Sequence, residues 1–198
     1  MASGDSLIFQ VLRPLLLWGV RINPVLRQLE AQPEERILDV GCGYGYLAKP
    51  LRHCQYTGLD LDPRRIDWAK RHFGENSNRK FFAADISHSG LRSKSFDKAV
   101  AFGLLHHLPD ETAVQCVQEL TRIVKKRIIF LDSVYSRFHI LNNLLCKLDQ
   151  GKYVRRDKEY LSLVSPHVPK TQGAFYHAHS GIAKYFMMTC DLDPGVRS

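Results

Sequence analysis

The chain has 198 residues, of which 44% are hydrophobic, and this fits one globular domain, residues 1–198, with a single core. Its formal net charge of +8 is spread mostly over separate basic pairs, a pattern typical of a solvated surface that does not favour nucleic acid as a partner. The five cysteines form no CxxC pair, which argues against a metal site or a disulfide framework and indicates reduced thiols in a cytoplasmic protein.

The first part of the chain carries apolar residues at helical spacing. Residues 5–30 are expected to form helical pieces broken by Pro14 and Pro24, and residues 1–34 to make an N-terminal helical cap. No basic leader of a signal peptide is evident, and the apolar segment Leu7–Val20 is too short to span a bilayer.

Strand-like and helix-like segments then alternate with short connections, which predicts a parallel sheet covered on both faces. Asp62 and Pro63 predict a helix start, because Asp caps a first turn and Pro suits the first helical position. Pro50 should shorten or bend the helix around it. The expected strands are 36–40, 56–61, 80–85, 96–103 and 127–132, and the expected helices are 45–53, 62–73 and 110–124.

The last third of the sequence follows a different pattern. Residues 133–170 are expected to form a helical insertion, rich in both charge and leucine. Two strand-like pieces, 174–179 and 184–190, are joined by Ser180 and Gly181, which predicts a terminal hairpin.

The segment Asp39-Val-Gly-Cys-Gly-Tyr-Gly45 is the most informative part of the chain. It follows a buried strand, as expected of a loop that brings backbone close to a ligand. The dinucleotide fingerprint does not fit, because its third glycine position holds Tyr46. A phosphate-binding loop does not fit either, since no Gly-Lys-Ser/Thr ending is present.

These residues resemble motif I of the class I S-adenosylmethionine-dependent methyltransferases, of the kind that act on small molecules. Three further motifs at suitable spacing extend the resemblance over about residues 35–135: Gly58-Leu-Asp-Leu61, Phe82-Ala-Ala-Asp-Ile86 and Phe96–Pro109. The resemblance implies an α/β, Rossmann-like sheet of seven strands in the order 3-2-1-4-5-7-6, with an antiparallel last hairpin. It also implies S-adenosylmethionine as the cofactor.

Each part of that cofactor has a candidate partner in the sequence. Asp60 ends the second strand about 20 residues after the glycine loop, where an acid can accept both ribose hydroxyls. By the resemblance, Asp85 accepts from the adenine amine, although an Asp there could also cap a turn near Ser87. The remaining contacts that the resemblance implies are Leu61 and Ile86 around the adenine, Asp39 at the ammonium, Gly41, Cys42 and Gly43 with their backbone donors toward the carboxylate, and Gly103 and Leu104 beside the methionine portion.

Four histidines could add chemistry. His106 and His107 follow the fourth strand, where either could act as a base for a hydroxyl acceptor or simply pack against the cofactor. His177 and His179 lie on one face of an expected strand, but no third metal ligand accompanies them, so packing or surface exposure is expected instead.

The predicted function is methyl transfer by direct in-line displacement to a small, lipophilic acceptor, with oxygen or carbon as the methylated atom. The insertion would cover the acceptor site. The alternative is a methyltransferase-like binding subunit without turnover, in peripheral contact with a membrane through Leu7–Val20 and the basic pairs. RNA methylation has only the net charge in its favour.

Overall fold

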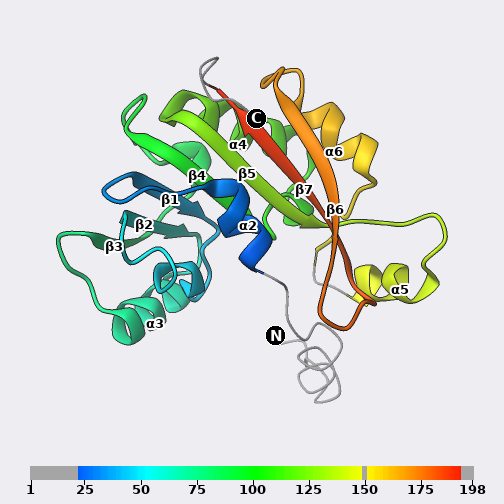
Figure 1. Cartoon of the computed structure of the whole chain (residues 1–198), viewed down its shortest axis with the longest axis horizontal. Coiled ribbons are helices and arrows are strands. Elements are labelled where there is room, and N and C mark those ends of the chain that lie inside the picture. Colours follow the sequence, from blue (N-terminus) through cyan, green and yellow to red (C-terminus); the bar gives the residue numbers. More distant parts are fainter. Residues whose placement is uncertain (1–21, 149–150, 193–198) are drawn as a thin grey trace.

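The protein contains a seven-stranded sheet, seen in a computed structural model that describes residues 22–148 and 151–192 (Figure 1). The strand order is β3-β2-β1-β4-β5-β7-β6, with β1 to β5 parallel and β7 antiparallel to both neighbours, which confirms the predicted fold. The strands are β1 (Arg36–Val40), β2 (Gln55–Asp60), β3 (Arg79–Ala83), β4 (Phe96–Phe102), β5 (Val124–Ser133), β6 (Thr171–His177) and β7 (Lys184–Asp191).

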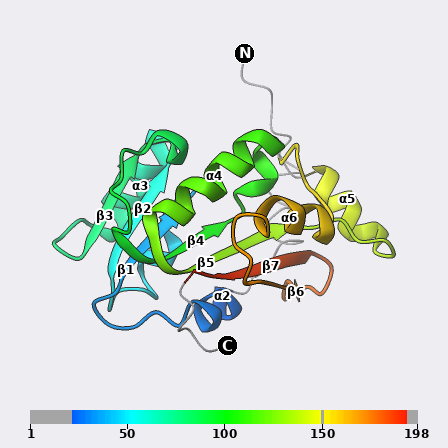
Figure 2. The same cartoon turned by 90° about the horizontal axis from the view of Figure 1, so that it is seen from above.

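Helices cover both faces of the sheet, so the central strands are buried on both sides. The apolar residues of α2 and α3 pack in one core cluster, and those of α4 and α6 in the other. Figure 2 shows α2 on one side of the sheet and α4 and α6 on the other. The α-helices are α2 (Ile22–Leu29), α3 (Pro63–Phe73), α4 (Asp110–Ile123), α5 (Ile140–Leu148) and α6 (Asp157–Val164), and the 3-10 helices are η1 (Tyr46–Ala48), η2 (Ile86–His88) and η3 (Leu105–His107).

The helix expected over residues 45–53 is wrong. Only the three residues of η1 are helical there, and turns follow. Gly45 adopts a left-handed conformation, with φ of 71°, and Pro50 has no N–H to donate, so the helix neither starts earlier nor extends.

The other boundaries differ less. Asp62 caps α3 as predicted, because its side chain accepts a hydrogen bond from the Arg64 amide over 2.9 Å. β6 ends at His177 instead of residue 179, so His179 lies outside the strand. Of the N-terminal helical cap, only α2 falls in the described range, and the segment Leu7–Val20 lies outside it.

Candidate active site

The carboxyl ends of the parallel strands meet at one edge of the sheet, and the candidate residues gather there. Val40 pairs with Leu59 on one side and with Ala101 on the other, and Phe102 pairs with Leu131. The residues that follow or end these strands are therefore neighbours. In an open α/β sheet, ligands bind outside this edge.

Asp60 links the second strand to the glycine loop. Its Oδ2 accepts a hydrogen bond from the Gly43 amide over 2.8 Å, and its Oδ1 accepts one from the Asp62 amide over 2.9 Å. The residue is 6% exposed. A carboxylate offers about four lone-pair sites, so two further donors can still be accepted.

The amides of the glycine loop are already engaged. Gly41 and Cys42 both donate to the carbonyl of Leu59, over 2.7 and 3.0 Å, and Gly43 donates to Asp60. In this structure the Gly41 and Gly43 amides therefore donate within the protein, and their donation to a ligand carboxylate stays a prediction. The short η1 also adds little helix dipole behind them.

Gly43 nevertheless leaves room for a ligand. Its φ is 53°, and a Cβ built on it would meet no atom within 4 Å. The space above the loop therefore accepts a group that approaches the backbone closely, which is what the expected cofactor requires.

Asp39 is buried one residue before the end of β1. It is 2% exposed, and its Oδ2 accepts a hydrogen bond from the Tyr56 hydroxyl over 2.6 Å. Burial raises the pKa of Asp39 to about 7, and the charge of Asp60 adds to this, while the Tyr56 bond acts in the opposite direction. Near neutral pH this carboxyl is therefore poised to gain or lose a proton.

The residues after β2 and β3 are divided between surface and core. The Asp85 side chain is 49% exposed, and its Oδ1 accepts from the Ser87 amide over 2.9 Å, which is the capping role considered for it. Leu61 is 74% exposed, whereas Ile86 is 6% exposed and packs in a core cluster. Of the two residues expected around an adenine, only Leu61 offers its side chain.

The loop after β4 contacts the glycine loop. A Cβ built on Gly41 would lie 3.1 Å from Leu104 Cδ1, so these two segments touch. The Gly103 amide donates to the carbonyl of Leu131 over 2.8 Å, which anchors the loop to β5.

His106 is joined to Asp132, a residue that the sequence analysis missed. His106 Nδ1 lies 2.7 Å from Asp132 Oδ1, and the His106 amide donates to the same oxygen over 3.1 Å. Asp132 is fully buried, and its Oδ2 has no hydrogen-bond partner within the described residues. A carboxylate accepts hydrogen bonds, so the hydrogen between the two groups is assigned to His106 Nδ1. His107 is exposed, with its ring centroid 4.1 Å from that of His106.

The insertion expected at 133–170 packs against the loop after β4 that carries His106 and His107, called the histidine loop below. Arg155 is 7% exposed and donates to the carbonyls of Leu105 and Leu108, over 2.8 and 2.6 Å. The Tyr153 amide donates to the His106 carbonyl over 2.9 Å, and a Cβ on Gly151 would overlap the His106 ring. This segment therefore lies directly on the loop that carries both histidines.

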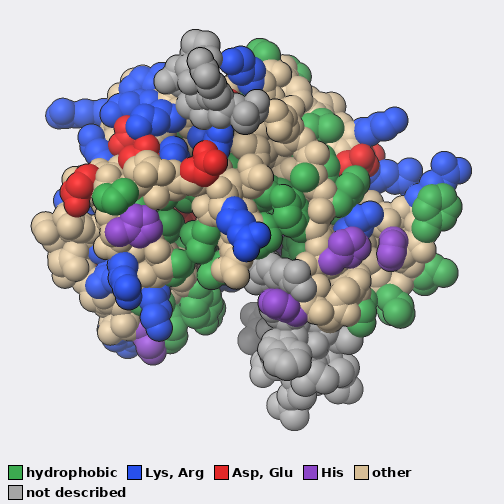
Figure 3. All heavy atoms as spheres, in the orientation of Figure 1, with side chains coloured by type: hydrophobic (Ala, Val, Ile, Leu, Met, Phe, Trp, Pro, Cys, Tyr) green, Lys and Arg blue, Asp and Glu red, His purple; other side chains and the backbone are tan. Residues whose placement is uncertain are grey.

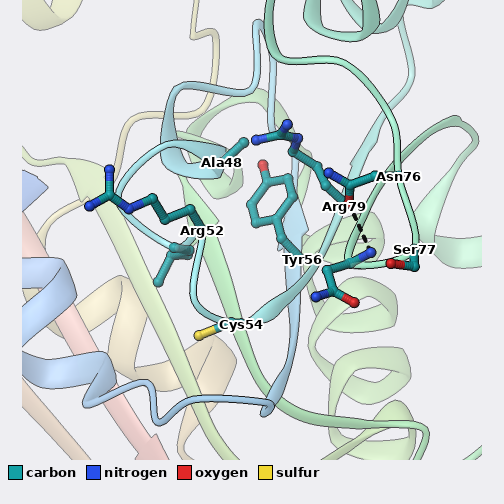
Figure 4. Close-up of a pocket in the computed structure, with 9 residues that line it drawn as sticks. Ala48, Arg52, Cys54, Tyr56, Asn76, Ser77 and Arg79 are labelled. Atoms are coloured by element: carbon teal, nitrogen blue, oxygen red, sulfur yellow. Dashed lines mark hydrogen bonds between the residues drawn. The ribbon is translucent and has the colours of Figure 1, made fainter.

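A separate cavity of about 290 Å³ opens at the other end of the sheet (Figure 4). It lies beside Tyr56 and Arg79, at the amino-terminal ends of β2 and β3, with Arg52 also lining it. Because the Asp60 side chain stands at the carboxyl-terminal edge, this cavity is distinct from the candidate cofactor site.

The described residues contain no group of three or more His, Cys, Asp or Glu placed to hold a metal ion. The ring centres of His177 and His139 lie 6.2 Å apart. Within the same residues no helix has the length and apolar character needed to cross a membrane.

Residues 37–127 match the model of a family described as "Methyltransferase domain". This matched segment, slightly less than half of the chain, is similar to methyltransferase domains. The predicted recognition as a class I S-adenosylmethionine-dependent methyltransferase, with S-adenosylmethionine as its cofactor, is confirmed.

Two curated relatives show how wide this methyltransferase family is. The chain is 29% identical over 110 residues to a ubiquinone biosynthesis O-methyltransferase of Vibrio cholerae, covering 54% of this chain and 44% of that protein. It is 34% identical over 136 residues to the tRNA N(3)-methylcytidine methyltransferase trm141 of Schizosaccharomyces pombe, covering 61% of this chain and 55% of the relative. The chain thus spans about half the length of the curated relatives it matches.

The fold of this methyltransferase also matches solved structures. Magnesium protoporphyrin IX methyltransferase from Synechocystis PCC 6803, solved with bound S-adenosylmethionine, aligns with a TM-score of 0.68 at 16% identity. The alignment covers 96% of this chain and 86% of that one. At this identity the likeness concerns the fold alone.

Proposed function

We propose that the chain transfers a methyl group from S-adenosylmethionine to a small, lipophilic acceptor. The observation that carries the proposal is the Asp60 carboxylate. It ties the glycine loop to β2 at the ligand-binding edge and keeps capacity for two more hydrogen bonds, beside open space over Gly43.

The proposed cofactor contacts begin with the nucleoside. Asp60 accepts from the two ribose hydroxyls, and Asp85 accepts from the adenine amine while the Ile86 amide donates to a ring nitrogen. Leu61, with its exposed side chain, packs on the adenine.

The proposed contacts of the methionine portion come from two loops. Asp39 stands near the ammonium, and the Tyr56 bond fixes its orientation. Cys42, Gly103 and Leu104 line this portion through the touching loops after β1 and β4.

Bound S-adenosylmethionine supplies a methyl group on a positively charged sulfur, which is already a good leaving group. The chain's own residues then act mainly by alignment, which can contribute much of the rate. For a hydroxyl acceptor, we assign His106 Nε2 the role of taking the acceptor proton. Asp132 holds the ring by its Nδ1 hydrogen, and His107 is the second candidate base because it is exposed.

Support for a lipophilic acceptor comes from the insertion. Residues 151–155 lie over the histidine loop, and Tyr153, with a 40% exposed side chain, offers an aromatic surface there. One relative is named as an O-methyltransferase of ubiquinone biosynthesis, which favours a small-molecule acceptor. This proposal also includes the assignment of residues 133–170 as a helical insertion that covers the acceptor site.

Calorimetric titration of S-adenosylmethionine and of its demethylated product tests the cofactor site. Asp60→Ala should lose most of the binding, since each hydrogen bond to a charged group contributes about 1.5–3 kcal/mol. Asp62→Ala is the matched control, because it removes the exposed cap of α3 and leaves the ribose acid intact. Equal affinity in wild type and Asp60→Ala would refute the site.

A binding subunit without turnover is the alternative function, and RNA methylation is a further candidate because of the tRNA-methylating relative. A screen for release of the demethylated product separates the three functions. One arm of the screen offers hydroxylated lipophilic compounds, and a parallel arm offers transfer RNA. Turnover only with transfer RNA would refute the small-molecule acceptor. Cofactor binding without turnover on any acceptor would favour the binding subunit.

A further inference from the structure

Helix α5 is built with its polar side inward. Asn142 is 1% exposed: its Nδ2 donates to the Val134 carbonyl over 2.8 Å, and its Oδ1 accepts from the Lys184 amide over 2.7 Å. Asn143 exchanges two hydrogen bonds with the backbone of Ser136. These hydrogen bonds, together with buried Cys146 and partly buried Leu145, fasten the helix to the protein.

The opposite side of α5 is apolar and open. Phe138 and Ile140 are each 84% exposed, Leu141 is 63% exposed and Leu144 is 51% exposed. Ile140, Leu141 and Leu144 share a helix face, because residues three or four apart are neighbours. A soluble surface rarely gathers so many large apolar side chains without a partner for them.

The neighbouring hairpin turn extends this surface. A groove of about 370 Å³ runs between the start of α5 and Ile182 of the β6–β7 turn, with Phe138 and Leu141 on its walls. Figure 3 shows hydrophobic side chains at this side of the molecule, with basic and histidine side chains next to them.

The two stretches of chain that build this surface are basic. The stretches 133–148 and 171–190 contain no Asp or Glu, while Arg137, Lys147 and Lys184 are basic. The Arg137 guanidinium lies 5.7 Å from the Phe138 ring centre, and Lys184 Nζ lies 4.1 Å from that of Phe175. Apolar side chains bordered by cations, without carboxylates, complement a surface with a hydrocarbon interior and anionic headgroups.

We propose that the apolar face of α5 and the adjoining β6–β7 turn form a docking surface for an anionic lipid bilayer. Phe138, Ile140, Leu141 and Leu144 enter the headgroup–acyl boundary, and Arg137, Lys147 and Lys184 meet the lipid phosphates. The proposal does not depend on catalysis. It differs from contact through Leu7–Val20, because its residues belong to the insertion and the last hairpin.

Vesicle co-sedimentation of the full chain tests the docking surface. We expect binding to mixed phosphatidylcholine–phosphatidylglycerol vesicles to be at least about tenfold tighter than to phosphatidylcholine alone, since each basic residue near the surface strengthens attraction about fivefold. Ile140→Glu should weaken binding to the mixed vesicles about tenfold or more. Phe82→Glu is the matched control, because Phe82 is 48% exposed on β3, at the opposite edge of the sheet.

Several outcomes would overturn the docking surface. They are absence of vesicle binding, equal binding to neutral and mixed vesicles, or an effect of Phe82→Glu as large as that of Ile140→Glu. Light scattering provides the other check: conversion of a wild-type dimer to a monomer by Ile140→Glu, with vesicle binding unchanged, would show that a second copy covers this face. Equal melting temperatures of wild type and Ile140→Glu would show that misfolding does not cause the loss of vesicle binding.

Discussion

The Tyr56 hydroxyl lies 2.6 Å from Asp39 Oδ2, and this bond joins β1 and β2 beneath the glycine loop. It gives the buried Asp39 carboxyl its one hydrogen-bonded side-chain contact among the described residues. The pKa of Asp39, at about 7, follows from burial that this single bond does not offset.

Asp39 should make stability fall as the pH rises. The folded protein keeps the Asp39 proton up to about pH 7, whereas the unfolded chain loses it near the ordinary value of 3.8. The stabilisation is thus complete below about pH 4 and is lost by about pH 7, at most about 4 kcal/mol. Urea unfolding of Asp39→Asn should show a flatter pH profile than wild type over this window. Parallel profiles would contradict the assignment.

Cofactor binding should release a proton from Asp39. An ammonium placed beside the carboxyl favours its charged form and lowers its pKa, so binding near neutral pH expels the proton. Calorimetry in buffers of different ionisation enthalpy measures this release, which should disappear in Asp39→Asn. Persistence of the release in that variant would mean that another group titrates.

Two glycine substitutions should separate binding from stability. Gly43→Ala should cost only about 1–2 kcal/mol of backbone strain and yet abolish most cofactor binding, because its methyl group fills the ligand space. In Gly45→Ala the new Cβ would lie 2.7 Å from Phe81 Cε1, so overpacking adds about 1–3 kcal/mol to the strain. Thermal melting and calorimetry on both variants check this, and retained binding in Gly43→Ala would exclude the space as a ligand site.

Arg155→Ala should destabilise the protein by about 2–4 kcal/mol. It removes the Arg155 donor from the Leu108 carbonyl and one of two donors from the Leu105 carbonyl, which keeps the Leu108 amide. An unsatisfied buried group costs about 1–3 kcal/mol. Asp110→Asn is the control, since the Asp110 side chain is 76% exposed and its ion pair with Arg155 should contribute less than about 1 kcal/mol. Urea unfolding of the two variants gives the comparison. A larger loss in Asp110→Asn would show that the ion pair, and not the carbonyl contacts, matters.

Asp132 should act through His106. On an acceptor that supports turnover, Asp132→Asn should lower kcat about tenfold or more, with the acceptor KM and the cofactor Kd unchanged. His106→Gln should do the same, and the double variant should be no slower than His106→Gln, because the two residues form one unit. A purely structural role would instead lower the melting temperature and raise both binding constants.

The central strands were predictable from the sequence because β1, β4 and β5 contain short apolar runs that end beside a glycine or an acid. The run 36–40 coincides with β1, and α4 ends at Ile123, within one residue of its expected end. The family resemblance supplied the strand order. The shortness of η1 was only partly accessible: Pro50 indicates it in the sequence, whereas the left-handed conformation of Gly45 does not show there.

The site was only partly predictable, because some of its contacts join distant parts of the chain. Asp132 could have been found, as it nearly ends a strand beside β4 and therefore faces the same edge. No local pattern marks Tyr56 or Arg155, whose partners are 17 and 50 residues away. The cofactor and base assignments to the named residues remain predictions.

The engaged amides of Gly41, Cys42 and Gly43 have a consequence for selectivity. Because these three amides already donate within the protein, this part of the loop selects what passes over Gly43 by steric fit. Nucleosides with a shortened amino-acid arm should be tolerated, and those enlarged next to the sulfur should be refused.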